Sequence, residues 1–467
     1  MKRIIGYFVL ALALLLTAEN MSAQTPQWRD MHKVKRGETI YSIARDYGIT
    51  VDDLVKANPE MATPDYVLKK GEFVCIPFPS GIPADTTTTS KPSPKPTDVT
   101  KPETNPGQRA ASNVDIRNRE VRVGVMLPLH KINGDGQRML EYYRGVLMAC
   151  DSLRQNGISV DIHAWNVAEN TDIRTFLKED AEKLDLIIGP LYSKMMKPLS
   201  DFVRKHQIKV LIPFSINTPE LDTNPYLYQV YQTPGEFCEQ SAEHFMKRFG
   251  TEHVVIIDCN DSTSRKGMFT SKIRKRLDAN NSDYKITNLK SSDQRFFESF
   301  TETGRNIVVL NTEKQHEFGA AISKLNSMLL DHPNLDISLF GYTEWMLYAK
   351  KNLESFYKFD VHIPTAFYYD EASPRTKRIE QKYRWNFHAD MMNTLPHFAI
   401  TGFDHAYYFI KGMSMYGTHF NGSPGMVGYP AIQTPLVFEQ LGDGGHQNRQ
   451  LMIVHYTKDH HVEIIRY

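Results

Sequence analysis

From residue 121 onward, short aliphatic runs alternate with longer amphipathic stretches. The runs are VRVGVML, SVDIHAW, LDLIIG, IKVLIPF, HVVIID, NIVVL and ISLFG. Continuous apolar runs separated by helical text are typical of parallel strands covered on both faces. The first connecting stretch predicts a helix over residues 138–155, which Gly157 ends. Because roughly 350 residues exceed one hydrophobic core, we expect residues 119–467 to form an α/β domain with two lobes.

A smaller unit precedes this region, at residues 31–79. The pattern predicts a short strand at 32–35, a helix capped by Thr39, a second helix, and a strand that returns at 73–77. The expected order is therefore strand, helix, helix, strand (βααβ).

Residues 80–118 separate the two units. They are rich in proline and threonine and contain no aromatic residue, as in KPSPKPTDVTKPETNP. Such a composition buries too little apolar surface to offset its ordering entropy. We interpret this stretch as a disordered linker that proline stiffens toward polyproline II.

The N-terminus has the pattern of an export signal. Lys2 and Arg3 precede an apolar run over residues 4–16, which is too short to span a bilayer core of about 30 Å. We predict a signal peptide over residues 1–23, with cleavage after Ala23. The expected location is periplasmic or in the cell envelope. No later stretch predicts a membrane span in the mature chain.

Charge and cysteine content narrow the possibilities further. The chain has 55 Lys+Arg against 54 Asp+Glu, a formal charge of +1, so it lacks the basic excess of nucleic-acid-binding proteins. Its four cysteines allow three pairings in an oxidising compartment. We favour free thiols because two of them lie in apolar patterns. The cysteines are Cys75, Cys150, Cys238 and Cys259.

The small unit resembles a LysM module through HKVKRGETIYSIARDYGITVDDLVKANPEM and LKKGEFVCIP. This resemblance implies binding of the N-acetylglucosamine-containing glycan of peptidoglycan or chitin, in a groove between the loop after the first strand and the loop after the second helix. The implied glycan-binding residues are Gly37, Glu38, Thr39, Ile40, Tyr41, Asn58, Pro59 and Glu60. Thr39 also suits a helix cap and Ile40 also suits the core.

The large region resembles the type I periplasmic-binding-protein fold, especially its branched-chain amino acid-binding group. VGVMLPLH, LIIGPLYSKMMKPLSDFVRKHQIKVLIPFSINTPEL and HVVIIDCNDSTSRKGMF carry the resemblance, which covers residues 120–440. It implies two lobes that close over a small molecule about crossing strands. The implied ligand-binding residues are Ser193, Ser215, Asn217, Ser264 and Glu317.

Two of these positions depart from the amino acid binders. Asn217 stands where they carry Thr, and Ser264 where they carry an aromatic residue. Ser193 and Asn217 also suit helix caps, and Glu317 suits an exposed helix position. Tyrosines near the expected strand ends could stack on a ligand or pack in the core. They are Tyr192, Tyr342, Tyr368 and Tyr369.

No catalytic constellation is complete in the sequence. Ser355 and Lys358 fit S-x-x-K, but S-D-N and K-T-G are missing, as are H-E-x-x-H, G-x-S-x-G and a Walker loop. Asp459, His460 and His461 are interpreted as the tip of a terminal hairpin rather than a metal site. We therefore predict no catalytic residue, metal or cofactor. The strand-like runs after residue 422 are expected to complete the second lobe.

The sequence thus predicts a non-catalytic envelope protein that binds peptidoglycan through LysM and recognises an amino acid-like or wall-derived solute in a two-lobed clamp. The alternative is a scaffold or regulator of peptidoglycan synthesis that uses the clamp for protein–protein interaction. The expected partners are peptidoglycan, a small ligand, and either a transporter permease or a wall-synthesis enzyme. No nucleic acid is among them.

Overall fold

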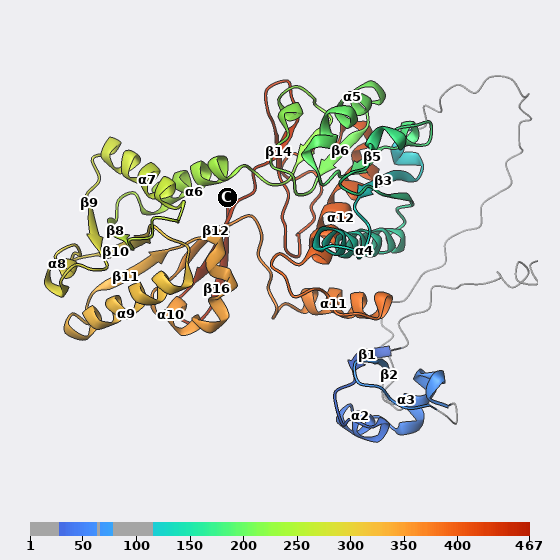
Figure 1. Ribbon diagram of the computed structural model, residues 1–467, viewed down its shortest axis with the longest axis horizontal. Coiled ribbons are helices and arrows are strands. Elements are labelled where there is room, and N and C mark those ends of the chain that lie inside the picture. The colour runs from blue at the N-terminus through green and yellow to red at the C-terminus, as the bar shows by residue number, and fades with distance from the viewer. Residues whose placement is uncertain (1–27, 63–65, 78–114) are drawn as a thin grey trace, which may run out of the picture. The chain divides into compact units, whose positions relative to one another are not determined.

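The computed structural model describes residues 28–62, 66–77 and 115–467 (Figure 1). The predicted signal peptide lies outside the described residues, and so does nearly all of the predicted linker. The chain divides into two compact units, one holding the N-terminal elements and the other residues 111–379 and 391–467. Each is described by itself. Within the described residues, no helix is both long and apolar enough to cross a bilayer.

The N-terminal unit has the predicted strand, helix, helix, strand order. The elements are β1 (Trp28–Lys33), α2 (Ile40–Asp46), α3 (Val51–Ala57), the 3-10 helix η1 (Pro59–Ala62) and β2 (Phe73–Pro77). The two strands pair antiparallel, with Met31 opposite Cys75. The first strand begins and ends earlier than predicted. Both helices cover the strand pair through a small core that includes Ile43, Leu54 and Val74.

Local signals explain the ends of α2. The Thr39 side chain accepts a hydrogen bond from the Ser42 amide (3.1 Å), and the Ser42 hydroxyl accepts one from the Thr39 amide (2.9 Å). This reciprocal capping box satisfies two helix N-terminal donors. Gly48 follows the helix with a φ of +66°, a conformation that favours glycine.

The large unit contains two seven-stranded sheets. The first has the order β13-β14-β7-β6-β5-β3-β4 and the second β16-β15-β12-β11-β10-β8-β9. Most neighbours are parallel, as the continuous apolar runs predicted. The first-sheet strands are β3 (Val121–Leu127), β4 (Val160–Asn166), β5 (Leu186–Ile188), β6 (Lys209–Ile212), β7 (Leu227–Gln229), β13 (Phe438–Gln440) and β14 (His446–Asn448). The second-sheet strands are β8 (His253–Asp258), β9 (Tyr284–Asn288), β10 (Arg305–Leu310), β11 (Asp336–Phe340), β12 (His362–Thr365), β15 (Met452–Tyr456) and β16 (Val462–Arg466).

Helices cover each sheet and define two lobes (Figure 1). The first lobe contains α4 (Gly134–Gln155), α5 (Met196–His206) and α12 (Phe398–Tyr416). The second contains α6 (Pro234–Phe249), α7 (Gly267–Ala279), α8 (Asp293–Phe297), α9 (Gln315–Asp331) and α10 (Leu353–Lys358). One further helix, α11 (Pro374–Phe387), follows β12. The two-lobed α/β prediction is confirmed, and α4 begins four residues before the predicted residue 138.

Within residues 115–467, the chain passes between the sheets three times: after β7, after β12 and after β14. The expectation that all strands after residue 422 complete the second lobe is therefore wrong in part. Only β15 and β16 join the second sheet, while β13 and β14 join the first. Alternating polarity identified these strands but carries no information about which sheet they extend. The pairing of β14 with β7 decides it.

The described part of the large unit begins before residue 119. Residues Ile116–Asn118 form a 3-10 helix, with the Asp115 side chain capping it and Ile116 buried. The predicted linker range of 80–118 therefore overlaps this turn at its end.

The cysteines are free thiols in the structure, as favoured by the sequence. Cys150 and Cys259 are buried, whereas Cys75 and Cys238 are half-buried. Burial raises the pKa of the Cys150 and Cys259 thiols to about 12, so both remain protonated at neutral pH.

Two glycines allow α4 and α12 to pack with their backbones in contact. A Cβ added to Gly145 would lie 1.8 Å from the carbonyl oxygen of Ala399, and one added to Gly402 would lie 2.0 Å from that of Tyr142. A neighbouring carbonyl on a helix cannot move aside as a flexible side chain can. Any side chain at either position must therefore push the two helices apart.

We predict that Gly402→Ala destabilises the protein by about 1–3 kcal/mol, the usual cost of overpacking. The matched control is Gly319→Ala in α9, where an added Cβ meets nothing within 4 Å. That change should be neutral or stabilise by about 0.5–1 kcal/mol through helix propensity. Urea unfolding of both variants measures the difference. Equal effects would show that the α4–α12 contact is less tight than described.

Candidate functional site

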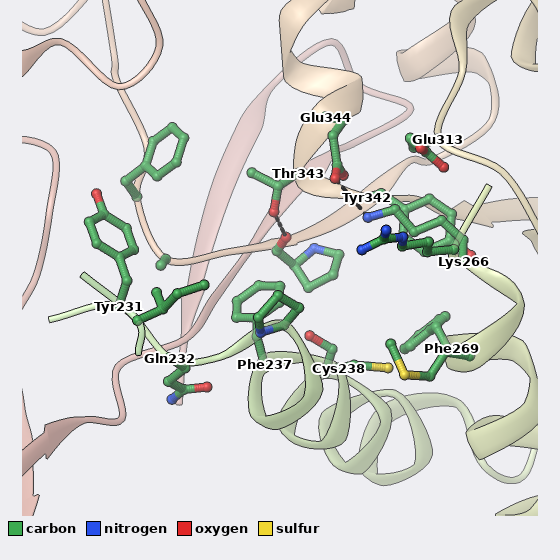
Figure 2. Close-up of a pocket in the computed structure, with 18 of the residues that line it drawn as sticks. Tyr231, Gln232, Phe237, Cys238, Lys266, Phe269, Glu313, Tyr342, Thr343 and Glu344 are labelled. Atoms are coloured by element: carbon green, nitrogen blue, oxygen red, sulfur yellow. Dashed lines mark hydrogen bonds and ion pairs between the residues drawn. The ribbon is translucent and has the colours of Figure 1, made fainter. Parts of the chain in front are cut away.

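A cavity of about 670 Å³ lies between the two lobes (Figure 2). Its lining comes from the loop after β6 in the first lobe, from several loops and helices of the second lobe, and from all three crossing segments. Crossing residues in the lining are Val230, Tyr231, Gln232, Ala366, Phe367 and Gln450. The volume falls in the range of sites for small organic ligands. The cavity also sits at carboxyl ends of parallel strands, where α/β proteins bind ligands.

The two sides of the cavity differ in chemistry. Phe214 and Ile216 of the first lobe, together with most crossing residues, present apolar surface. The charged lining residues all belong to the second lobe, in loops after β8, β10 and β11. They are Arg265, Lys266, Glu313 and Glu344. The cavity is thus amphipathic, with its charge confined to one wall.

An ion pair spans part of the charged wall. Lys266 Nζ lies 2.7 Å from Glu344 Oε1 and 4.8 Å from the centroid of the Tyr342 ring. Figure 2 shows Glu344 pointing toward Lys266, with Glu313 set apart from the pair. Burial raises the pKa of Tyr342, so the phenol stays neutral beneath the ammonium group. Across the described part of the chain, the exposed Arg265 guanidinium has no hydrogen-bond or ion-pair partner.

A network of hydrogen bonds fixes the loop that carries both cations. The Asp261 carboxylate accepts hydrogen bonds from the Thr263 amide (3.0 Å), the Thr312 hydroxyl (2.8 Å) and Lys314 Nζ (2.9 Å). These bonds, led by that from Lys314, lower the pKa of Asp261, which therefore stays ionised. These bonds tie the loop after β8 to residues 312 and 314 after β10.

The five predicted ligand residues do not line this cavity. The hydroxyls of Ser193 and Ser215 hydrogen-bond each other (2.9 Å), Ser264 donates to Glu313 Oε2 (2.6 Å), and Asn217 is exposed. Glu317 lies on α9, away from the lining. Their immediate neighbours line the cavity instead: Phe214 and Ile216 flank Ser215, and Thr263 and Arg265 flank Ser264.

Three of the five predicted positions, Ser215, Asn217 and Ser264, thus sit next to lining residues, and the assignment of all five to a ligand stays a prediction. The basic dipeptide Arg265-Lys266 in DSTSRKG was the available signal for the charged wall. Of the four tyrosines considered, Tyr342 lines the cavity. The Tyr192 hydroxyl instead donates to Asp135 (3.4 Å), and Tyr368 and Tyr369 lie outside the lining.

A buried carboxylate organises the chain beside the second crossing. Asp404 in α12 accepts hydrogen bonds from the amides of Ile432, Gln433 and Thr434 and from the Tyr429 hydroxyl, at 2.6–2.8 Å. Burial raises the pKa of Asp404 while these four donors oppose the rise. The Gln433 carbonyl in turn accepts from the Tyr368 amide (3.0 Å), which ties residues next to Phe367 to α12.

In the N-terminal unit, several predicted glycan residues are engaged in the fold. Glu38 accepts from the Lys35 amide (2.6 Å) and pairs with His32 (2.7 Å), and the Thr39 side chain caps α2. The Asn58 side chain, 1% exposed, bonds the Leu54 carbonyl and both the amide and the carbonyl of Cys75. These three side chains are thus engaged within the domain, and the backbone amides of Glu38, Thr39 and Asn58 are bonded as well.

The other predicted glycan positions remain accessible. Tyr41 is 69% exposed, and Gly37, Pro59 and Glu60 are also exposed, whereas Ile40 is half-buried against the core. The two predicted loops therefore offer a surface of exposed backbone and one large aromatic side chain.

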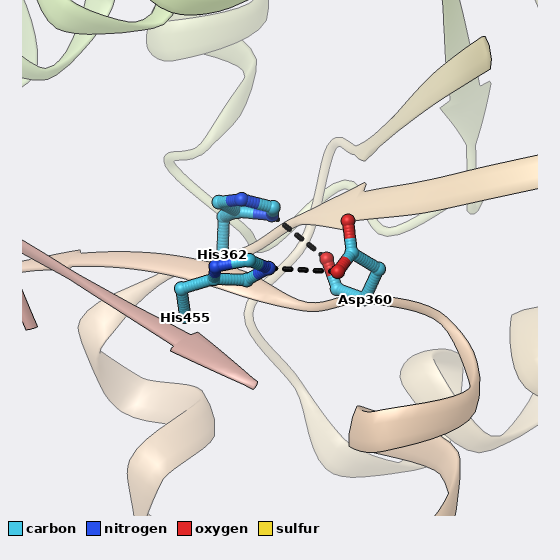
Figure 3. A group of neighbouring side chains, drawn as sticks. All are labelled: Asp360, His362 and His455. Carbon is cyan, nitrogen blue, oxygen red and sulfur yellow. Dashed lines mark hydrogen bonds and ion pairs between the residues drawn. The ribbon is translucent and has the colours of Figure 1, made fainter. Parts of the chain in front are cut away.

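Asp360, His362 and His455 form a buried cluster of possible metal ligands in the second lobe (Figure 3). His455 Nε2 lies 2.7 Å from Asp360 Oδ1, and His362 Nδ1 donates to the Asp360 carbonyl (2.7 Å). The two imidazole rings stack, with centroids 3.9 Å apart and planes at 17°. Because a metal binds in the plane of an imidazole, near-parallel stacked rings do not direct their lone pairs to one point. The cluster therefore favours structural hydrogen bonding over metal ligation.

The other candidates for chemistry have structural partners. Lys358 Nζ donates to Asn326 Oδ1 (2.6 Å). Asp459, His460 and His461 lie between the antiparallel strands β15 and β16, which confirms the predicted hairpin tip.

The buried histidine leads to a prediction about pH. Burial lowers the pKa of His362 to about 3, and nearby His455 and Arg248 lower it further while Asp360 opposes them. Below about pH 6.5 the His362 imidazole therefore binds a proton in the unfolded chain, whereas it stays neutral in the folded chain. The contribution of the neutral imidazole to the free energy of unfolding is fully present above that pH and is lost as the pH falls toward 3.

We expect His362→Gln to reduce the loss of unfolding free energy between pH 7 and 5, by up to about 1.4 kcal/mol per pH unit. Urea unfolding at the two pH values measures it. The control is His316→Gln, whose side chain is 91% exposed and should leave the slope unchanged. The same slope in all three proteins would contradict a neutral buried His362.

Comparisons with known proteins agree with both units. Residues 32–77 match the family model described as LysM domain. A search of curated proteins finds no match. Among solved structures, a putative branched-chain amino acid ABC transporter from Rhodospirillum rubrum matches with 13% identity and a TM-score of 0.51, covering 74% of this chain and 100% of that one.

Two further structures match less well. A branched-chain amino acid ABC transporter periplasmic ligand-binding protein from Burkholderia xenovorans LB400 has 10% identity, coverage of 74% and 94%, and a TM-score of 0.45. An ABC transporter substrate-binding protein from Sphaerobacter thermophilus has 12% identity, coverage of 75% and 98%, and a TM-score of 0.43. Residues 32–77 are a LysM domain, and the larger unit has the two-lobed fold of type I periplasmic binding proteins.

Proposed function

We propose that this is a non-catalytic, extracytoplasmic envelope protein that attaches to peptidoglycan through its LysM domain and recognises a small solute in the clamp. The inter-lobe cavity, lined by both lobes and by all three crossings, carries the proposal. A ligand there would contact both lobes and the three segments that join them. Binding and lobe closure would therefore be coupled.

The solute is amino acid-like or wall-derived and has an apolar part. Aromatic and aliphatic side chains, among them Phe214, Phe237 and Phe269, dominate the lining. A cavity of about 670 Å³ also accommodates more than a single small amino acid. A permease or a wall-synthesis enzyme would then bind the closed state in preference to the open one.

The proposal predicts that the full chain is stabilised against heat by at least one member of a panel of free amino acids, short peptides and muropeptides. Ile216→Trp, which places an indole in the cavity lining, should abolish that shift. The matched control Ile132→Trp changes a side chain that is 89% exposed and outside the lining, so it should retain the shift. Silence across the panel, with capture of a wall synthase, would instead favour the scaffold alternative.

For the LysM domain, we predict that Tyr41→Ala reduces co-sedimentation with purified peptidoglycan severalfold without changing the unfolding midpoint. Its side chain lies in the predicted groove and is mostly exposed. Asn58→Ala should instead destabilise the domain by about 1–3 kcal/mol, because it leaves buried backbone groups of Cys75 and Leu54 without partners.

The control for sedimentation is Val67→Ala. Val67 is 70% exposed in the same domain but outside the two predicted loops. An equal loss of binding in the Tyr41 and Val67 variants would place the glycan elsewhere on the domain.

A further inference from the structure

Two turns of matching sequence lie side by side in the LysM domain. The sequence reads KRGE at residues 35–38 and KKGE at residues 69–72. In each turn the glycine has a positive φ, +87° for Gly37 and +88° for Gly71, and a backbone hydrogen bond joins the last residue to the first (3.4 and 3.1 Å). Val34 connects the two turns, because its amide donates to the carbonyl that ends the second turn (2.9 Å) and its carbonyl accepts from the Gly71 amide (2.8 Å). We call residues 35–38 and 69–72 the paired turns.

The acidic residue of each turn is folded back on the turn itself. Glu38 Oε2 accepts from the Lys35 amide (2.6 Å), and Glu72 Oε2 accepts from the Lys69 amide (2.9 Å). Glu38 also pairs with His32 (2.7 Å), and its side chain is 20% exposed. Both carboxylates are therefore engaged within the domain.

The basic residues of the paired turns are instead exposed: Lys35, Arg36, Lys69 and Lys70. Among the residues that the structure describes, the side chains of Arg36, Lys69 and Lys70 form no hydrogen bond or ion pair. The paired turns hold four cations and two carboxylates, which gives them a formal charge of +2. The other predicted glycan loop, residues 58–60, carries one acidic residue, Glu60, and no basic residue. The positive charge therefore lies on the side of the first loop.

We propose that the paired turns bind carboxylates of the peptide stems of peptidoglycan while the adjoining loop holds the sugar chain, an inference that rests on the proposed function. Gly37 and Glu38 belong both to the first turn and to the predicted glycan loop, which continues to the exposed Tyr41. A substituent on a sugar in that loop therefore lies next to the basic side chains.

This arrangement distinguishes the two glycans that the LysM resemblance left open. Alternate sugars of peptidoglycan carry a short peptide with free carboxylates, whereas chitin is uncharged. The exposed cations of the paired turns attract the first polymer and gain nothing from the second. The LysM domain would thus recognise the charged substituents of the wall in addition to its sugars.

Several cations are needed because each exposed contact is weak. A single exposed ion pair contributes little and is screened by salt. Four cations on two adjoining turns raise the local positive potential together, so a peptide with several carboxylates is attracted by all of them at once. The resulting preference is electrostatic and must fall as the ionic strength rises.

Three soluble hexasaccharides test the inference: chitohexaose, a peptidoglycan fragment with tripeptide stems, and the same fragment with its carboxylates amidated. At low salt, isothermal titration with the full chain should give roughly fivefold tighter binding of the fragment with free carboxylates than of either other probe. At about 0.5 M NaCl the difference should fall below about twofold. The double variant Arg36→Gln/Lys70→Gln should bind the acidic and the amidated fragments within about twofold of each other at low salt.

The matched control is Arg45→Gln/Lys56→Gln, the same two changes at exposed positions of α2 and α3 outside both predicted glycan loops. It should keep the roughly fivefold preference for the acidic fragment. Equal affinities of the unmodified chain for the acidic and amidated fragments, or an equal loss of preference in the two double variants, would overturn the inference while leaving sugar binding intact. Failure of all three hexasaccharides to bind would instead contradict the proposed attachment to peptidoglycan.

Discussion

The contact between α4 and α12 is the constraint on which the larger unit depends. The two helices are far apart in the sequence, and they meet backbone to backbone at Gly145 and Gly402. The chain reaches α12 only after it has crossed to the second lobe and returned. This close contact therefore fixes the return of the chain to the first lobe. The same helix carries Asp404, whose carboxylate holds residues 432–434 beside the second crossing. Helix packing in one lobe thereby positions part of the cavity wall.

A different set of bonds aligns the first and third crossings. Gln229 ends β7 and Gln447 lies in the middle of β14. Each side-chain amide donates to an oxygen of the other residue, at 3.0 and 3.1 Å, and Gln232 donates to the Asn448 carbonyl at 3.1 Å. Gln229 and Gln447 are both buried, and these bonds hold the two crossings side by side where they leave the first sheet.

The sequence predicted the architecture well because the architecture follows from two local signals. These are the spacing of apolar residues and the capping residues and glycines at the ends of elements. Thr39 caps α2 as expected, and the aliphatic runs became the parallel strands. It failed where the outcome depends on pairing across long distances. Nothing in the alternation of residues 438–448 distinguishes the first sheet from the second. Within the loops that line the cavity, a one-residue shift turns a side chain away from it, so the sequence pattern alone does not tell which residue faces the cavity. Ser264 bonds Glu313, whereas Arg265 beside it lines the cavity. In the LysM domain, Asn58 was expected to contact a sugar, but its amide holds β2 to α3.

The Lys266–Glu344 pair keeps the charges on this wall of the cavity partnered without fixing them in place. The side chains are 23% and 45% exposed, and ion pairs of such exposure contribute about 0–1 kcal/mol. Separating them therefore costs little. A charged group of the proposed solute would therefore displace either partner at little cost, and Lys266 already lies over the Tyr342 ring, 4.8 Å from its centroid. If the first lobe covers this wall, water is excluded and the effective dielectric constant falls, so each such pairing strengthens.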